Sequence, residues 1–215
     1  RLYGNGQDLI GYRVPSASIW GGISLNDVKV FGTGESGGSV PHPEDPDIIY
    51  HLAQSSFAAG GCPIQRINLK TEQYEHVNVW PMITFGRGQK HAKYRFNWQA
   101  PFLVSRHEPN TIYFAGNVVF RTRDEGMNWE VISPDLTTNP SRDEIMTMGV
   151  RNDEIRIARN DGISNWGTIV SLAESPAQPG VYYTGTDDGV VSVSRNGGGS
   201  WQDVTPNLPG FPEGG

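Results

Sequence analysis

Apolar residues along the chain occur in short runs bounded by Gly, Pro, Asn or Asp, as at 111–116, 118–121 and 190–193. A helical period of 3.6 residues is hard to find in any window of about eleven residues. The chain contains 27 Gly and 15 Pro, more turn-forming residues than a helical protein tolerates. Short runs between turn formers are typical of strands. We therefore expect an all-β protein built from many short strands.

Two stretches of the chain repeat one order of strands and turns, in which a Pro-containing turn precedes a run containing Tyr and a polar turn closes on Trp. The candidate strands lie at 102–105, 111–116, 118–121 and 129–132, and again at 169–172, 181–185, 190–193 and 201–204. A weaker copy precedes both, with runs at 48–50, 64–67 and 74–77, and closes on Tyr74. The pattern indicates a tandem repeat.

Tyr50, Tyr113 and Tyr183 hold the same place in the three copies, at spacings of 63 and 70 residues. A propeller blade usually takes about 40–50 residues, so insertions must explain the excess. Two long segments, 78–99 and 134–166, are the candidates. Loops of this length often carry function, which makes them the first places to look for a binding surface.

Tandem four-stranded units form either a radial propeller or a row of independent sandwiches. Continuous apolar runs such as 118–120 suit strands buried on both faces, which favours the propeller. A closed ring takes about four to eight blades, so we expect a partial β-propeller of about three four-stranded blades, a fragment of a larger ring. The segments are 1–39 from a preceding blade, 40–99 as a degenerate blade with an aromatic insertion, 100–164 as a blade with a polar insertion, and 165–215 as a blade with a tail.

Two turns share the arrangement Ser/Thr-x-Asp/Asn-x-Gly-x-x-Trp. The first comprises Thr122, Asp124, Gly126 and Trp129, and the second comprises Ser194, Asn196, Gly198 and Trp201. The Asp or Asn side chain can accept hydrogen bonds from turn amides, the Gly permits a positive φ, and the Trp can pack beneath the turn. We expect these eight residues to be structural and not catalytic.

These turns resemble the Asp-box, or BNR, repeats of sialidases, sortilin-type propellers and xyloglucan-specific hydrolases. Segments 93–102, 106–113, 129–137, 172–176, 185–189 and 204–207 are similar to bacterial secreted sortilin-like proteins, often labelled glycosyl hydrolases by similarity. The resemblance covers roughly residues 30–210. It implies an extracellular or periplasmic propeller several times longer than this chain, and the absence of an initiator Met also fits a piece of a longer protein.

Charge and composition limit the partners. A formal net charge of −6, with 17 scattered basic residues, disfavours a nucleic-acid surface. No apolar stretch is long enough for a membrane span. The single cysteine, Cys62, cannot form an intrachain disulfide and is expected to be a small buried residue. The expected partners are the remaining blades or neighbouring chains, with a glycan or peptide as ligand.

The aromatic insertion supplies the leading candidates for ligand contact. Aromatic rings flanked by cations can stack sugars or hold peptide carboxylates, although they can also form a plug over a blade edge. In the last copy, Asp187 and Asp188 with nearby carbonyls form a candidate calcium site; no other cofactor is expected. The candidate contacts are Trp80, Arg87, Tyr94, Arg95, Trp98, Asp187 and Asp188.

A catalytic set is not evident. Arg13, in a Tyr-Arg-Val-Pro stretch, resembles a sialidase arginine, but the other arginines and the Tyr–Glu pair are not assigned. Acids suited to a glycosidase all lie near turns, where solvated Asp is common: Asp45, Asp47, Asp153, Glu154, Asp187 and Asp188. The five histidines lack metal-ligand spacing. We expect a non-catalytic recognition scaffold, with a glycoside hydrolase and a structural or assembly protein as alternatives.

Overall fold

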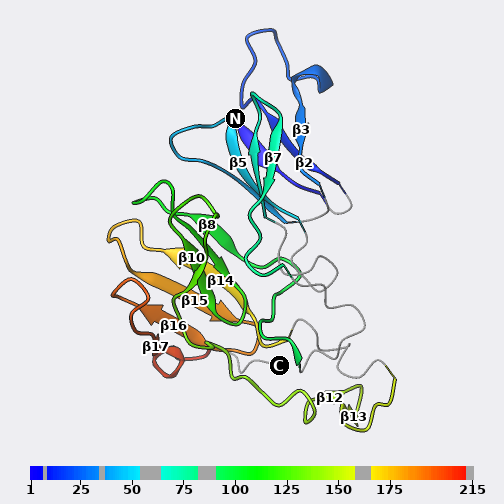
Figure 1. Ribbon diagram of the computed structural model, residues 1–215, viewed down its shortest axis with the longest axis vertical. Coiled ribbons are helices and arrows are strands. Elements are labelled where there is room, and N and C mark those ends of the chain that lie inside the picture. Colours follow the sequence, from blue (N-terminus) through cyan, green and yellow to red (C-terminus); the bar gives the residue numbers. More distant parts are fainter. Residues whose placement is uncertain (7–8, 34–36, 54–63, 82–90, 158–165, 212–215) are drawn as a thin grey trace.

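The computed structural model describes residues 1–6, 9–33, 37–53, 64–81, 91–157 and 166–211. Its main elements form four antiparallel sheets, which we call A to D (Figure 1). Sheet A contains β1 (Leu2–Gly4), β2 (Gly11–Val14) and β3 (Lys29–Phe31). Sheet B contains β4 (Gly38–Pro41), β5 (Ile48–Leu52), β6 (Ile64–Asn68) and β7 (Gln73–His76).

Sheets C and D complete the fold. Sheet C contains β8 (Phe102–Val104), β9 (Ile112–Ala115), β10 (Val119–Thr122) and β11 (Glu130–Val131). Sheet D contains β14 (Ile169–Glu174), β15 (Tyr182–Thr186), β16 (Val191–Ser194) and β17 (Gln202–Asp203). Strands follow one another in chain order within each sheet. The expected all-β fold is confirmed, with short 3₁₀ helices at Leu25–Asp27 and Thr205–Asn207.

One element was not expected from the sequence. A small hairpin, β12 (Met146–Thr147) and β13 (Val150–Arg151), lies within the long connection between sheets C and D. Met148 and Gly149 at its tip have positive φ, so the turn uses the left-handed region. The polarity of the connection predicted a loop because two-residue strands carry almost no alternation to read.

Sheets B, C and D are copies of one unit, as two sets of equivalent backbone hydrogen bonds demonstrate. In the first set, an amide just after the first strand donates to a carbonyl at the start of the second strand. The three bonds run from His42 N to Ile48 O, from Ser105 N to Thr111 O and from Ser175 N to Val181 O. In the second set, the amide of the residue after the fourth strand donates to a carbonyl at the start of the third strand. These bonds run from Val77 N to Ile64 O, from Ile132 N to Val119 O and from Val204 N to Val191 O. Tyr50, Tyr113 and Tyr183 each lie two residues beyond the first set of carbonyls. The alignment made on these tyrosines is therefore confirmed.

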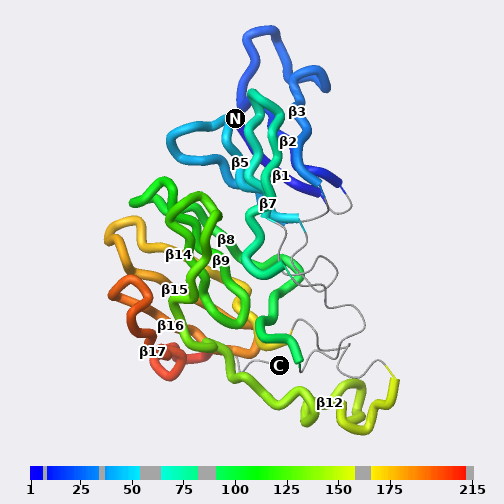
Figure 2. Tube along the Cα trace, in the orientation of Figure 1, coloured from blue at the N-terminus to red at the C-terminus, as the bar shows by residue number. Residues whose placement is uncertain are grey.

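The sheets are arranged like the blades of a propeller. The first strand of each four-stranded sheet lies beside the first strand of the next, β4 beside β8 and β8 beside β14. The trace in Figure 2 follows the same succession from blue through green to red. Tyr50 and Tyr113 are buried by the sheet that follows, whereas the equivalent Tyr183 is 47% exposed. The structure is thus a partial propeller of four-stranded blades.

Separate hydrophobic clusters fill the spaces between sheets. Sheet A packs on sheet B through Phe31, Ile49 and Ile67. Between B and C the cluster is rich in phenylalanine, and between C and D it contains the paired tyrosines Tyr113 and Tyr182. Their hydroxyls lie 2.6 Å apart. The two interfaces therefore have the same backbone arrangement but bury different side chains.

Candidate functional site

The two Trp-closed turns have the same hydrogen-bond geometry. Thr122 Oγ1 accepts from the amide of Gly126 at 3.0 Å, and Asp124 Oδ1 accepts from the amide of Asn128 at 2.8 Å. In the second turn the corresponding bonds run from Gly198 to Ser194 at 3.0 Å and from Ser200 to Asn196 at 2.9 Å. Asn196 thus replaces the acid without loss of the amide bond.

The glycine and tryptophan of each turn join one sheet to the sheet before it. Trp129 Nε1 donates to the carbonyl of Val77 at 3.1 Å, and Trp201 Nε1 donates to the carbonyl of Ile132 at 2.9 Å. Gly126 has a φ of 98°, and Gly198 a φ of 93°. A Cβ at either glycine would lie 3 Å or less from the same carbonyl-bearing residue of the preceding sheet. We call this arrangement the turn clamp.

Asp124 differs from Asn196 in carrying a charge. Hydrogen bonds from the side chain and the amide of Asn128, and from Thr122, lower the pKa of Asp124 to about 2. A carboxyl held ionised by donors within its own turn is a poor proton donor at neutral pH. The side chain therefore serves the turn.

The described part of the aromatic insertion packs as a small stack. Trp80 and Tyr94 contact edge to face at 5.1 Å, and Tyr94 contacts Phe120 of β10 at 4.9 Å. The Lys93 ammonium lies 5.0 Å from the centroids of both Trp80 and Tyr94. Trp98 is partly buried. Candidate Arg87, like Cys62, lies outside the described residues.

Arg95 belongs to a buried polar network. Its side chain is 9% exposed, and its guanidinium donates to Asp135 Oδ2 at 2.9 Å, to Thr137 Oγ1 at 3.0 Å and to the carbonyl of Gly167 at 3.0 Å. These partners come from the two ends of the long connection between β11 and β14. Arg95 therefore fastens that connection to sheet C, and its cation does not face solvent.

Asp135 accepts four hydrogen bonds. Oδ1 accepts from the amide and the hydroxyl of Thr137, and Oδ2 accepts from Arg95 and from Asn117 at 2.7 Å. Burial raises the pKa of Asp135, but the bonds from Thr137 and Asn117 and the charge of Arg95 outweigh it, so the pKa lies below its usual value. This carboxylate is ionised, and all its favourable acceptor positions are used.

Asp187 and Asp188 lie at the β15–β16 turn and extend the network. Asp187 accepts from the amides of Gly167 and Thr168, while Asp188 accepts from the amide and hydroxyl of Thr138 at 2.8 Å. Both carboxylates thus face N–H and O–H donors. Within the part of the chain that the structure describes, no group of three or more His, Cys, Asp or Glu side chains is placed to hold a metal ion.

Arg142, also from the long connection, lies beside these acids. It is 7% exposed and donates to the carbonyl of Trp166. Burial, followed by the charge of Arg95, lowers the pKa of Arg142 to about 10, against the opposing charges of Asp187 and Asp135. Two buried guanidiniums and three carboxylates therefore lie together at this edge of sheets C and D.

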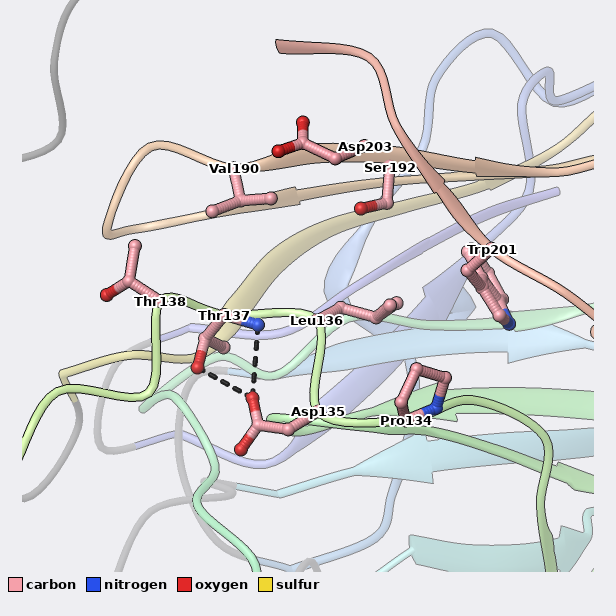
Figure 3. A pocket seen from close by; sticks show the side chains of 9 residues that line it. All are labelled: Pro134, Asp135, Leu136, Thr137, Thr138, Val190, Ser192, Trp201 and Asp203. Carbon is pink, nitrogen blue, oxygen red and sulfur yellow. Dashed lines mark hydrogen bonds between the residues drawn. The ribbon is translucent and has the colours of Figure 1, made fainter.

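A pocket of about 370 Å³ borders this network. One wall is the segment that follows β11, and the other is formed by β16 and β17, with Trp201 at one end (Figure 3). The carboxylates of Asp135 and Asp203 belong to opposite walls. The lining residues are Pro134, Asp135, Leu136, Thr137, Thr138, Val190, Ser192, Trp201 and Asp203. Since both walls belong to consecutive sheets of this chain, the pocket needs no further blade to form it.

Comparisons with known proteins yield weak structural likenesses. No family model matches the chain, and no curated protein matches its sequence. YCF48 from Cyanidioschyzon merolae is 15% identical over 77% of this chain and 35% of its own, with a TM-score of 0.40. An ancestral GH74 enzyme is 15% identical over 77% and 17%, with a TM-score of 0.42. YCF48 bound to D1 peptide is 14% identical over 77% and 45%, with a TM-score of 0.37. The chain spans less than half the length of each of these structures.

The other sequence candidates are dispersed. Arg13 donates to Asp47 at 2.8 Å and so joins sheet A to sheet B. Asp45 Oδ1 caps its own turn through the amide of Asp47, and Asp153 pairs with Arg151 on the β12–β13 hairpin. No helix among the described residues is long and apolar enough to cross a membrane.

The pocket itself was found only in part from the sequence. The length of the insertion 134–166 predicts a binding surface there, and this segment supplies Asp135, Thr137 and Thr138. Ser192 and Asp203 were not singled out, because nothing in the local sequence marks which face of β16 and β17 meets the loop. Trp201 was predicted as a structural residue and also lines the pocket.

Proposed function

We propose that the chain is part of a secreted, sortilin-like propeller of the Asp-box kind that recognises a protein, peptide or glycan and does not cleave it. The conserved hydrogen-bond geometry of the two turns supports the Asp-box assignment. The resemblance to secreted sortilin-like proteins supports the location. The binding surface in this proposal is the pocket between the segment after β11 and β16–β17.

One observation carries the preference for binding over catalysis. Asp135, a partly buried carboxylate of the pocket, accepts four hydrogen bonds and has a lowered pKa. A general acid needs a raised pKa and a proton to give, and a nucleophile or base needs a free oxygen lone pair. Asp135 has neither property. It is suited to holding the pocket wall in place.

A glycoside hydrolase is the second candidate because Asp135 and Asp203 stand on opposite walls of one pocket. Paired carboxylates across a cleft are the common machinery of glycosidases. In this alternative Asp203 would have to perform the chemistry with a partner that is already saturated.

Turnover assays separate the two candidates. The chain is incubated with xyloglucan, β-glucans and sialosides, and released sugars are measured. We expect no turnover above the blank. Hydrolysis that falls 100-fold or more in Asp203→Asn or Asp135→Asn, but persists in Asp124→Asn, would establish the enzyme and overturn the proposal.

Binding is tested with peptide and glycan arrays. We expect at least one class to be retained by the chain and lost in Val190→Phe, whose ring extends into the mouth of the pocket. Glu154→Gln, just after the β12–β13 hairpin and outside the pocket lining, is the control and should bind normally. Retention of every ligand by Val190→Phe would contradict the pocket as the binding surface.

A further inference from the structure

Three polar residues form a row across one face of sheet D. Ser192 of β16 lies opposite Thr184 of β15 on one side and opposite Asp203 of β17 on the other. Side chains at opposed positions of an antiparallel sheet project from the same face. Ser192 and Asp203 line the pocket, so this face is the one turned toward the segment after β11.

The row is short of hydrogen-bond partners. Ser192 is 3% exposed and Thr184 is 2% exposed, and the Thr184 hydroxyl is buried without a hydrogen-bond partner among the described residues. Asp203 Oδ1 accepts from the amide of Thr205 at 2.8 Å, which leaves Oδ2 without a described partner. Asp203 is exposed and lines the pocket, whereas Thr184 does not line it, so Asp203 Oδ2 is the charged acceptor of this row that a ligand can reach.

The facing wall offers few polar atoms to a ligand. The hydroxyl of Thr137 donates to Asp135, and the hydroxyl of Thr138 donates to Asp188. Asp135 is saturated, as described above. The rest of the lining is apolar, from Pro134 and Leu136 together with the ring of Trp201. A ligand therefore meets an apolar surface, one available carboxylate oxygen and the Ser192 hydroxyl.

We infer that the pocket binds the basic side chain, Lys or Arg, of a peptide or protein segment; the inference rests on the recognition function proposed above. A long aliphatic stem suits the wall formed by Pro134, Leu136 and Trp201. The cationic end group donates hydrogen bonds to Asp203, and the Trp201 ring adds a favourable interaction with the charge. Among the described residues, no Lys or Arg side chain lines the pocket to compete for this position.

A sugar fits this lining less well. Recognition of a polyol requires donors as well as acceptors, because each hydroxyl both donates and accepts. The indole of Trp201 already donates to Ile132, so among the described lining residues the Ser192 hydroxyl is the single side-chain donor that is not engaged. A guanidinium or ammonium group needs acceptors only, and Asp203 supplies a charged one.

The test is an NMR titration of the Trp201 indole N–H, identified by its loss in Trp201→Phe. The probes are Nα-acetyl-arginine amide, its neutral isostere Nα-acetyl-citrulline amide, and cellobiose. We expect a saturable shift with the arginine probe that weakens about 10-fold or more with citrulline, because the charge is lost.

Asp203→Asn keeps an oxygen for the Thr205 amide while it removes the charge, so the fold is retained. This variant should lose about 10-fold in affinity for the arginine probe, and Glu154→Gln, which removes an equal charge elsewhere, should lose none. Equal affinity for arginine and citrulline, or an unchanged Asp203→Asn, would overturn the inference. A saturable shift with cellobiose alone would also overturn the inference, but it would leave the recognition function intact. The recognition function is overturned by a different result, hydrolysis in the turnover assay.

Discussion

The interface between sheets B and C and the interface between sheets C and D are built on the same plan but filled differently. In each, a turn tryptophan donates to the carbonyl of the residue after the last strand of the preceding sheet. Between B and C the space holds Phe114, Phe120 and Phe96, the last from the connection between the sheets. Between C and D it holds paired tyrosines, a charge network and the pocket.

This difference teaches where a repeat protein can place a site. The backbone repeat and the turn clamp occur at both interfaces between four-stranded sheets, so those positions are constrained by the fold. The connection between consecutive sheets is free to differ, and it decides whether the space is filled by an aromatic plug or lined by Asp135, Thr137 and Thr138. Function is therefore expected in the connections and on the strand faces that meet them.

The largest effect should follow from a cavity in the apolar interface. Phe114 is fully buried between B and C, so Phe114→Ala should lower the free energy of unfolding by about 3–5 kcal/mol. The neighbouring Tyr113→Phe, which removes only the hydroxyl pair with Tyr182, should cost about 1 kcal/mol. Urea denaturation followed by tryptophan fluorescence measures both. Similar losses in the two variants would show that the interfaces do not differ as described.

A smaller loss is expected from the charge network between C and D. Asp135→Ala leaves the Arg95 guanidinium buried without its carboxylate and should cost about 3 kcal/mol. The double variant with Arg95→Met should be less destabilised than the sum of the single variants. Asp203→Asn, at the opposite wall, should change stability by less than about 0.5 kcal/mol. Strict additivity of the Asp135 and Arg95 substitutions would show that the pair is not coupled.

The turn clamps should contribute equally at the two interfaces. Trp129→Phe and Trp201→Phe each remove one hydrogen bond to the preceding sheet and part of a ring, so each should cost about 1–2 kcal/mol. Chemical denaturation of the two variants is the measurement. Losses that differ by more than about 1 kcal/mol would mean that the clamp is not equivalent in the two copies.

The smallest expected effect is a pH dependence in the first Trp-closed turn, which contains Asp124, that is absent from the second, which contains Asn196. The pKa of Asp124 is about 2 in the folded chain and about 3.9 when unfolded, so its contribution is present above pH 4 and is lost as the pH falls through 2. The amide resonance of Asn128 should therefore titrate in this range, whereas that of Ser200, bonded to neutral Asn196, should not. Asp124→Asn should abolish the titration of Asn128. A titration that persists in this variant would place its origin elsewhere.

Much of the fold could be predicted from local pattern. Strand positions near Tyr113 and Tyr183 were visible because apolar runs and turn residues alternate regularly, and Tyr74 was recognised as the weak counterpart of Trp129. The β12–β13 hairpin was missed because its strands are two residues long. The burial of Arg95 and its ion pair could not be predicted from local pattern, since its carboxylate partner, Asp135, lies 40 residues further along the chain.

The sequence by itself determined the repeat, its register and the turn clamps, because turn hydrogen bonds and the need for positive φ act over a few neighbouring residues. Only the tertiary structure decided which polar residues share a space. Asp203 and Ser192 belong to sheet D, whereas Asp135 follows sheet C, and their meeting depends on how the two sheets pack. Burial and partner count, which turn Asp135 into a structural carboxylate and leave Asp203 available, are likewise properties of that packing.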